Sequence, residues 1–370
     1  MKFRCEREVL ADALATAGRA ATSRTGTLPV LSGLRLEVKG DQLSVIGTDL
    51  ELSIRLTVAV GGERDGAVVV PARLTADIVR SLPAGAVEVS LGDDGSGAGD
   101  TVSISAGRSQ FSIRPLGLDD YPSQVEPAVE AVTLSSSAVS EALRQVVRAA
   151  STDDARAVLT GVLIAAEDDG VRMVATDSYR LAVRDLKDTD MLAGGQRVLV
   201  PSRALNELQR ILGGSEELQV RLGARDAVFE SGGTRLTTRL IEGEYPNYRN
   251  LLPPSYPNVL TVGRDSLLEA LRRVKLLAQD ATPVRLALGG DTLVLTAITQ
   301  DVGNASEAID ATYEGTEMTV AFNPDYLAAG VDAAEAEEVT LSTADPMKPA
   351  VIRPVGRDDY LYLLMPVRVP

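Results

Sequence analysis

The sequence predicts an α+β protein of three tandem domains, each of two helices packed on antiparallel sheets. Three observations support this fold class. Amphipathic helix patterns recur along the chain, short runs of alternating apolar and polar residues follow each of them, and these landmarks keep the same order in each copy. A helical period and a strand period that recur together at a fixed spacing indicate repeated supersecondary units.

Each copy opens with an amphipathic helix. Apolar residues recur at helical spacing, and in the second copy Val139, Leu143 and Val146 share one face. Ser137 and Asp265 stand at two of the predicted starts, where a short polar side chain can cap the helix. We expect these first helices at residues 6–21, 137–150 and 265–278.

Strand patterns follow each opening helix and match between the first two copies. Leu31-Ser32-Gly33 matches Leu159-Thr160-Gly161, and Thr48-Asp49 matches Thr176-Asp177, both at an offset of 128 residues. The third copy, from Pro283, is shorter and more diverged. Clusters of glycine and aspartate predict hairpin turns at residues 40–41, 168–170 and 289–291.

A second unit of strand, short loop and helix completes each copy. It is predicted over residues 67–83, 197–212 and 318–333, with Pro71, Pro201 and Asn323 in the loops. Proline-rich segments at 121–130 and 251–260 separate the copies. These boundaries define an N-terminal domain at 1–126, a central domain at 127–254 and a C-terminal domain at 255–370.

Composition excludes most catalytic chemistry. The 370 residues include no histidine and one cysteine, so histidine-based nucleophile systems, histidine-ligated zinc, iron–sulfur clusters and intrachain disulfides are excluded. We expect no catalytic residue, no metal and no cofactor. The start lacks an apolar signal core, and no apolar run is long enough to span a bilayer. Cys5 is then a small buried hydrophobe in a cytoplasmic protein.

Two motifs resemble chemical sites but have simpler explanations. The glycine-rich segment 92–100 lacks the P-loop pattern and fits a hairpin loop. Paired aspartates such as Asp153-Asp154 and Asp358-Asp359 fall where turns and helix caps are expected. A carboxylate-metal nuclease or hydrolase is the hypothesis that these pairs would support, and turnover lost in Asp153→Asn would favour it.

Arginine placement carries more information than net charge. The 37 basic residues include only five lysines, although the net charge is -15. Arg73 and Arg80 are seven residues apart, as are Arg203 and Arg210 at equivalent places in another copy, so each pair shares a helix face. Basic faces on an acidic chain fit sequence-independent contacts to phosphates. Solvated helix faces with glutamate partners explain the same pattern equally well.

The C-terminal segment YLYLLMPVRVP is strongly apolar. It is either the last edge strand of the third domain or one border of a groove for an extended peptide.

Several motifs, in this order, make the whole chain similar to the bacterial beta sliding clamp, the processivity subunit of DNA polymerase III. They are MKF at the start, TLPVLSGL, VPAR, GRSQFSI, ATDSYRLAVR, LIEGEYPNYRNLLP, FNPDYL and LLMPVR. The resemblance implies three clamp domains that close into a six-domain ring as a homodimer, with double-stranded DNA in the hole. It also implies a non-enzymatic processivity factor whose partners are the polymerase III catalytic subunit, a clamp loader, and other polymerases and repair proteins with short linear motifs.

The resemblance assigns three sets of residues. The inner surface that contacts DNA corresponds to Arg24, Arg73, Arg80, Arg144, Arg148, Arg203 and Arg210. The peptide groove corresponds to Leu159, Thr176, Arg180, Leu181, Pro246, Leu251, Asn323, Tyr326, Met347, Leu363, Met365, Pro366, Val367 and Arg368. The dimer interface corresponds to Phe111, Ile113, Leu276 and Leu277. The alternative is that these four residues belong to the core of each protomer and take no part in dimerisation.

The chain departs from the family at a few positions. Ser178-Tyr179 replaces a common Gly-His, and Asn250 replaces a frequent arginine. Ala157 and Val158 replace two tyrosines that lie near DNA in well-known members. Ala157 and Val158 indicate that this DNA contact is absent. The changes at Ser178, Tyr179 and Asn250 put ligand preference in doubt, and they motivate the alternative of a clamp paralogue with an altered groove that acts as a specialised or inhibitor-resistant binding hub.

Overall fold

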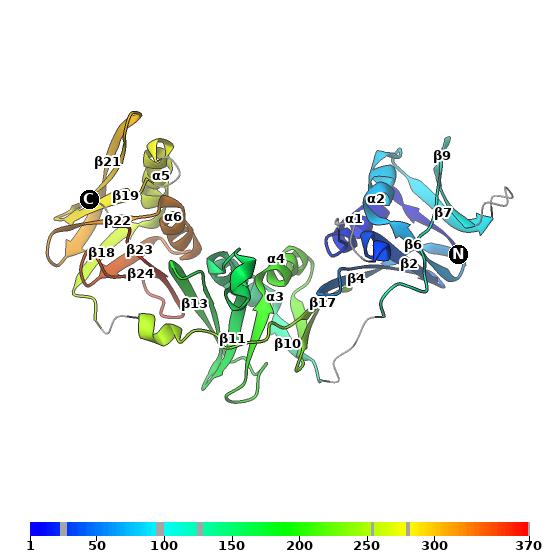
Figure 1. Ribbon diagram of the computed structural model, residues 1–370, viewed down its shortest axis with the longest axis horizontal. Coiled ribbons are helices and arrows are strands. Elements are labelled where there is room, and N and C mark those ends of the chain that lie inside the picture. Colours follow the sequence, from blue (N-terminus) through cyan, green and yellow to red (C-terminus); the bar gives the residue numbers. More distant parts are fainter. Residues whose placement is uncertain (23–27, 94–99, 124–128, 253–254, 279–281, 369–370) are drawn as a thin grey trace. The chain divides into compact units, whose positions relative to one another are not determined.

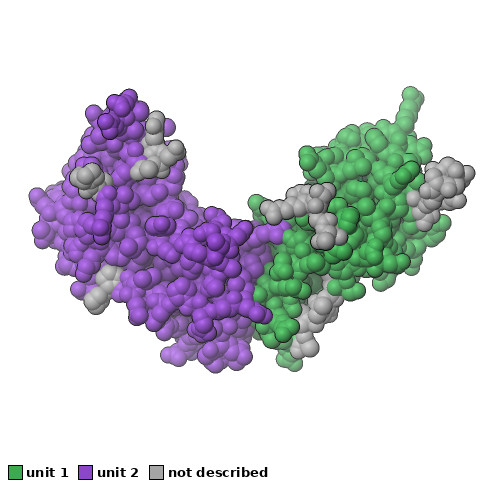
Figure 2. Space-filling model, in the orientation of Figure 1, with its two compact units in different colours: residues 1–137, 207–240 green, residues 138–206, 241–370 purple. Residues whose placement is uncertain are grey.

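The computed structural model describes residues 1–22, 28–93, 100–123, 129–252, 255–278 and 282–368. The chain forms two compact units, one of residues 1–137 with 207–240 and one of residues 138–206 with 241–370 (Figure 2). The exchange of segments near residues 137 and 206 places the strands that end the central domain in the first unit.

Six α-helices lie in the described part of the chain, two in each copy of the repeat (Figure 1). Their order matches the predicted order of first and second helices. They are α1 (Arg7–Gly18), α2 (Ala72–Ser81), α3 (Ser136–Val146), α4 (Ser202–Ile211), α5 (Arg264–Val274) and α6 (Pro324–Ala333). Short 3-10 turns continue the ends of three of them, namely η2 (Val147–Ala149), η4 (Leu212–Gly214) and η6 (Lys275–Leu277).

The first unit contains two antiparallel sheets. The five-stranded sheet has the order β5 (Gly61–Arg64), β1 (Lys2–Glu6), β7 (Ala86–Asp93), β8 (Asp100–Ala106) and β9 (Ser109–Ile113). The eight-stranded sheet has the order β10 (Val132–Ser135), β15 (Glu217–Leu222), β16 (Asp226–Ser231), β17 (Thr234–Arg239), β4 (Leu52–Ala59), β3 (Gln42–Thr48), β2 (Gly33–Lys39) and β6 (Gly66–Pro71). The pair β4 and β17 therefore joins the first copy to the second.

The second unit contains one twelve-stranded antiparallel sheet. From one edge its order is β14 (Arg197–Pro201), β11 (Gly161–Glu167), β12 (Gly170–Thr176), β13 (Arg180–Lys187), β25 (Tyr360–Leu364) and β24 (Ala350–Pro354). It continues with β23 (Glu338–Thr343), β18 (Asn258–Gly263), β21 (Gly303–Glu314), β20 (Thr292–Thr299), β19 (Val284–Gly289) and β22 (Met318–Phe322). The pair β13 and β25 joins the second copy to the third, as β4 and β17 join the first to the second.

The predicted hairpins are confirmed. Turns at residues 40–41, 168–169 and 290–291 connect β2 to β3, β11 to β12 and β19 to β20. The predicted caps were placed one or two residues too late. Helix α3 begins at Ser136, so Ser137 lies in its first turn, and Gly263 is the N-cap of α5 with Asp265 inside the helix.

Alternation along the strands separates the core from the outer face. In β2, Leu34, Leu36 and Val38 are buried, whereas Arg35 and Glu37 between them are partly exposed. This two-residue period is what a sheet with one buried face requires. Within the described residues no helix is long and apolar enough to cross a membrane.

Candidate nucleic-acid and peptide interfaces

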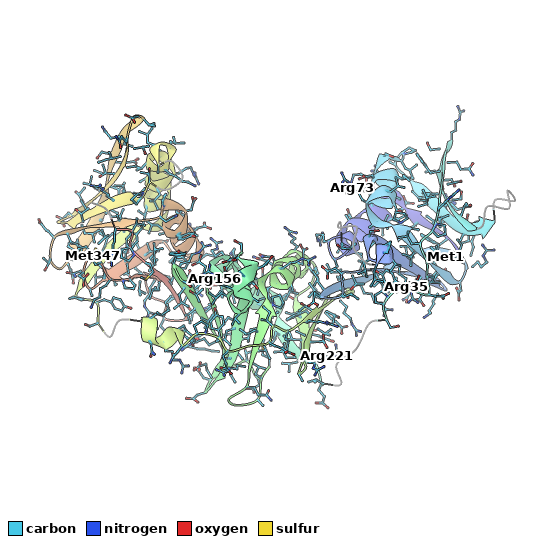
Figure 3. The ribbon with its side chains drawn as sticks, viewed as in Figure 1. Met1, Arg35, Arg73, Arg156, Arg221 and Met347 are labelled. Atoms are coloured by element: carbon cyan, nitrogen blue, oxygen red, sulfur yellow. The ribbon has the colours of Figure 1, made fainter. Side chains whose placement is uncertain are left out.

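The predicted arginine pairs lie on exposed faces of α2 and α4. The side chain of Arg73, labelled in Figure 3, is 98% exposed and that of Arg80 is 63% exposed. Each lies within 4.0 Å of Asp77. On α4, Arg203 is exposed, and Arg210 forms a 2.7 Å ion pair with Glu207. Each helix thus carries two arginines with one carboxylate between them in the sequence, as expected for helix faces with acidic partners. Arg24 lies outside the described residues.

Arg144 and Arg148 serve the packing of the second unit. Arg144 forms a 2.5 Å ion pair with Glu335, beyond the end of α6. Arg148 forms a 3.0 Å ion pair with Asp332 and donates a hydrogen bond of 3.1 Å to the carbonyl of Ala329. A guanidinium near the last carbonyls of a helix also stabilises the helix dipole. These two cations hold the third domain to the second, and any phosphate contact would compete with these bonds.

An apolar cluster gathers three of the predicted peptide-groove residues. Leu159, Leu181 and Leu363 are at most 9% exposed and belong to one cluster with residues of the central domain, the following loop and the C-terminal domain. Leu181 pairs with Leu363 across β13 and β25. The loop after β17 supplies Tyr245 and Tyr248 to the same cluster, and burial raises the pKa of Tyr245, so its phenol stays neutral. We refer to this cluster and its rim as the peptide surface.

The turn between β12 and β13 forms one rim of the peptide surface, and Thr176 shapes it. The Thr176 hydroxyl donates to the carbonyl of Arg180 at 2.6 Å and accepts from the N–H of Ser178 at 3.1 Å. The Asp177 carboxylate accepts from the N–H groups of Tyr179 and Arg180 at 2.9 and 3.0 Å. Thr176 is buried, so its role is to fix the turn.

The first domain repeats this turn bond for bond. Thr48 donates to the carbonyl of Leu52 at 3.2 Å and accepts from the N–H of Leu50 at 3.1 Å. Asp49 accepts from the N–H groups of Glu51 and Leu52 at 3.1 and 2.8 Å. The Thr-Asp match at an offset of 128 residues therefore marks a hydrogen-bonded turn that both copies share, and its role is structural in each.

Arg180 and Tyr326 link the rim to α6. The guanidinium of Arg180 lies 4.2 Å from the centroid of the Tyr326 ring and forms a 3.0 Å ion pair with Asp177. The Asn323 side chain caps α6 by accepting from the N–H groups of Asp325 and Tyr326 at 2.9 and 3.1 Å. These contacts set the position of the Tyr326 ring.

The C-terminal segment is held in an extended path between two domains. The N–H of Met365 donates to the carbonyl of Tyr179 at 2.9 Å, and that of Val367 donates to the carbonyl of Ala321 at 2.8 Å. Pro366 between them has no N–H to bond. From the sequence, this segment was either an edge strand or the border of a groove. It contains strand β25, and the residues after the strand are hydrogen-bonded along the peptide surface.

Exposed apolar side chains occur around this surface. Met347, Leu251 and Met365 are 55%, 46% and 38% exposed, and Tyr179 is 60% exposed. Met347 lies in the loop that leads into β24, whose Val351 belongs to the apolar cluster. The other two predicted members, Pro246 and Arg368, are also exposed.

The predicted dimer residues lie on two elements with open apolar surface. Phe111 is 38% exposed on β9, the edge strand of the five-stranded sheet, whereas Ile113 on the same strand is 8% exposed. Leu276, in the 3-10 turn after α5, is 82% exposed, and Leu277 is partly buried. Phe111 and Leu276 thus present apolar area that the protomer does not cover.

Arg156 is a rim residue that the sequence did not point to. This residue, labelled in Figure 3, donates to the carbonyl of Asp177 at 3.2 Å and to the Ser178 hydroxyl at 3.3 Å. It also forms a 3.0 Å ion pair with Asp153. Asp153 also caps the turn that follows it, as predicted for the aspartate pairs. The equivalent of Arg156 in the first copy is Leu28, so the repeat gave no signal.

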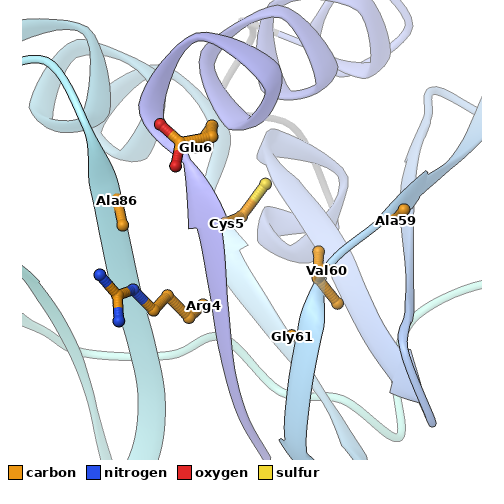
Figure 4. A pocket seen from close by; sticks show the side chains of 7 residues that line it. All are labelled: Arg4, Cys5, Glu6, Ala59, Val60, Gly61 and Ala86. Atoms are coloured by element: carbon orange, nitrogen blue, oxygen red, sulfur yellow. The ribbon is translucent and has the colours of Figure 1, made fainter.

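A shallow pocket of about 390 Å³ lies beside β1, lined by Arg4, Cys5, Glu6, Ala59, Val60, Gly61 and Ala86 (Figure 4). Burial raises the pKa of the Cys5 thiol, which is therefore a poor nucleophile. The described residues contain no group of three or more histidine, cysteine, aspartate or glutamate side chains that could hold a metal ion.

A threefold repeat of two helices on antiparallel sheets, with basic helix faces and an apolar peptide surface, defines a DNA sliding clamp. Models of the N-terminal, central and C-terminal domains of the DNA polymerase III beta subunit match residues 1–125, 133–247 and 249–368. The chain belongs to this family of bacterial beta sliding clamps.

Relatives and solved structures agree over the full length of the chain. A beta sliding clamp of Streptomyces coelicolor is 37% identical and one of Synechococcus elongatus is 34% identical, each with all of both chains covered. The crystal structure of the Bacillus subtilis DNA polymerase sliding clamp has a TM-score of 0.92 at 28% identity, and that of a Pseudomonas aeruginosa clamp bound to griselimycin has 0.90 at 28%. Both structures match all of this chain and are themselves matched in full.

Proposed function

We propose that two copies of this chain close into a ring around duplex DNA and tether the polymerase III catalytic subunit to it. In this proposal Phe111 and Ile113 of one protomer meet Leu276 and Leu277 of the other, because a head-to-tail pair of first and third domains closes with two copies. The support is that Phe111 and Leu276 are exposed apolar side chains, one of them on an edge strand. Edge strands are ready partners for another chain.

The arginine-bearing helix faces would meet the phosphates. Among the described members, Arg73, Arg80, Arg203 and Arg210 are exposed, and Arg144 and Arg148 share their charge with Glu335 and Asp332. Arg24, which lies outside the described residues, completes the proposed set. Phosphate contacts carry no sequence information and exchange readily, which permits sliding. The ring itself supplies retention, so we propose no catalytic activity in this chain, and a separate clamp loader must open it.

We place the peptide site at the junction of the second and third domains, because this junction differs from the one between the first and second domains. The row that pairs Leu181 with Leu363 is apolar, whereas the equivalent row between the first two domains pairs Ser53 with Thr237. An apolar floor with a few polar groups at its rim suits a short linear motif. Polymerases and repair proteins with such motifs are the proposed ligands.

The experiment is peptide binding by fluorescence anisotropy, with a labelled peptide that carries the clamp-binding motif of the polymerase catalytic subunit. Leu251→Ala and Met365→Ala should each weaken binding by about tenfold, as expected for exposed anchors at an interface. Leu118→Ala, an exposed leucine of the first unit, is the control. Deletion of residues 365–370 should abolish binding and leave the dimer intact. Equal losses in the control and groove variants would contradict the assignment.

We further propose domain boundaries near residues 126 and 254. The proposed location is the cytoplasm, where the chain would act on DNA. The alternative of a specialised paralogue rests on Ser178, Tyr179 and Asn250, and the exposure of Tyr179 at the rim favours altered ligand preference over loss of the site. Wild-type affinity for the polymerase peptide in the range of other clamps would favour the replicative role.

A further inference from the structure

The six methionines of the chain, all within its described part, differ widely in exposure. Met347 and Met365 are 55% and 38% exposed, whereas Met1 and Met173 are 5% and 2% exposed, and the other two are partly buried. Both exposed methionines lie at the peptide surface. Cys5, the only cysteine, is buried. A reagent in solvent that attacks sulfur therefore reaches the thioethers of the peptide surface more readily than any other sulfur of the protein.

Strand register brings the two exposed methionines to one end of the pair β24 and β25. Ala350 lies opposite Leu364, so the segment that enters β24 and the segment that leaves β25 are at the same end of the pair. Met365 directly follows Leu364, and Met347, labelled in Figure 3, precedes Ala350 by three residues. The two methionines thus belong to one border of the peptide surface.

This border adjoins the apolar floor. Val351 and Leu363 are paired across β24 and β25, and both belong to the apolar cluster. A ligand that covers the floor and its border also removes thioether surface from water. Methionine suits such a border because its flexible, polarisable side chain adapts to the shape of a bound segment.

The backbone N–H groups of both methionines are already hydrogen-bonded. That of Met347 donates to the Asp345 carboxylate at 2.8 Å, and that of Met365 donates to the carbonyl of Tyr179 at 2.9 Å. These bonds fix the backbone positions of the two residues. They also mean that neither N–H is left over to donate to an extra oxygen on the methionine side chain.

We propose that Met347 and Met365 are sites of reversible oxidation by peroxide, and that their oxidation releases a short linear motif from the peptide surface. This regulation rests on the proposed function of that surface. In the reaction with hydrogen peroxide, a sulfur lone pair attacks one peroxide oxygen, the O–O bond breaks and a sulfoxide S–O bond forms. The other oxygen leaves as water after a proton shift. Each sulfur loses two electrons and the peroxide gains them.

The sulfoxide should act on binding and spare the fold. In the free protein the new oxygen is hydrated, because both side chains reach solvent. Against an apolar ligand the same oxygen loses its water without gaining a donor, and burial of an unpaired polar group is costly. The modification is also reversible, because methionine sulfoxide reductases return each sulfoxide epimer to the thioether.

The first measurement is the rate of oxidation at each methionine. The full-length protein is treated with hydrogen peroxide, the reaction is stopped with catalase, and sulfoxide is quantified by mass spectrometry of proteolytic fragments. We expect Met347 and Met365 to be oxidised at least about tenfold faster than Met173, because exposure controls access to sulfur. Equal rates at the three positions in the folded protein would overturn the proposal.

The second measurement is the anisotropy of a labelled, methionine-free peptide that carries the polymerase motif. Oxidation should weaken its binding by at least about tenfold without changing thermal melting, and treatment with both classes of sulfoxide reductase should restore it. Unchanged affinity after complete oxidation of Met347 and Met365 would overturn the regulation while leaving the proposed function in place. Absence of binding by the untreated protein would overturn the proposed function and this regulation together.

Two double variants separate these sulfurs from the rest of the chain. Met347→Leu with Met365→Leu keeps apolar side chains that peroxide does not oxidise, so its affinity should differ less than twofold before and after treatment. The matched control is Met191→Leu with Met318→Leu, two partly buried methionines that we do not place at the peptide surface. It should bind as the parent does and lose as much affinity on oxidation. Equal losses on oxidation in the two double variants would contradict the assignment to Met347 and Met365.

Discussion

Leu50 and Ser178 occupy equivalent turns and share an unusual backbone conformation. Their φ angles are 78° and 80°, in the left-handed region that favours glycine, and no other residue type adopts it without cost. The hydrogen bonds of Thr48 and Asp49 hold Leu50 there. The chain thus keeps both turns while accepting strain at two residues that are not glycine.

Replacing Leu50 by glycine should raise the free energy of unfolding of the first unit by about 0.5–1 kcal/mol, because relief of the left-handed strain exceeds the entropy cost of glycine. The midpoint of urea denaturation is measured by circular dichroism or by tyrosine fluorescence, since the chain contains no tryptophan. Leu118 is similarly exposed but does not have a positive φ, so Leu118→Gly should lower the midpoint. A fall in both variants would show that Leu50 is not strained.

The burial of the Cys5 side chain can be tested by its reaction rate with a thiol reagent. It is 6% exposed, and burial raises the pKa of its thiol, so less thiolate is present at pH 8 than for a free cysteine. The native protein should react with a disulfide reagent at least about tenfold more slowly than the unfolded chain. Equal rates in buffer and in urea would contradict the buried position of β1.

Gly330 determines how closely helix α6 approaches strand β25. A Cβ atom at this position would lie 2.4 Å from the Tyr362 ring, and the backbone of Gly330 has an ordinary φ, so only space requires glycine. Burial raises the pKa of Tyr362 to about 12, in keeping with a neutral, enclosed ring. This contact fixes the helix that carries Tyr326 and the strand that carries Leu363.

We expect Gly330→Ala to destabilise the second unit by about 1–3 kcal/mol through overpacking, and to weaken binding of the polymerase peptide in parallel. Thermal melting and anisotropy with the same protein check both effects. Gly18→Ala is the control, since nothing lies within 4 Å of a Cβ there, and it should leave stability unchanged or slightly higher. An unaffected melting temperature in Gly330→Ala would mean that α6 can shift without loss.

Helices, hairpins and their order could be predicted because each copy repeats a local pattern. Once the helices were predicted, the arginines on them could be assigned to a helix face from their spacing, as for Arg73 and Arg80 on α2. The role of Arg156 at the rim could not be predicted, because its bonds to Asp177 and Ser178 depend on tertiary packing. The second role of Arg144 and Arg148 was hidden for the same reason, since Glu335 and Asp332 are almost two hundred residues away in the sequence.

At the scale of the whole molecule, repetition lets one fold carry different surfaces. The junction that pairs β13 with β25 is apolar, and the equivalent junction of β4 with β17 is cationic. Divergence on one face of the sheet, such as Val183 against Arg55, gives the two junctions different chemistry. A tandem repeat can thus add ligand specificities while its core sequence pattern stays the same.

Because the arginines of α2 and α4 are exposed, their proposed contacts to DNA can be tested without disturbing the core. Arg73→Glu with Arg203→Glu reverses two charges per chain on exposed side chains, so folding and dimerisation should be unchanged. Loss of phosphate contacts should shorten retention on nicked circular DNA by at least about tenfold at 50 mM salt, with a shallower salt dependence than the parent. Both proteins should leave linear DNA quickly, because the ring can slide off its ends.

The control is Arg4→Glu with Arg225→Glu, which makes the same charge change on β1 and in the loop before β16. Native mass measurement first establishes that all three proteins are dimers. If retention on circles is the same in all three, the helix faces of α2 and α4 do not meet the DNA. A loss in the control that equals the loss in the Arg73 and Arg203 variant would instead show that net charge, rather than arginine position, governs retention.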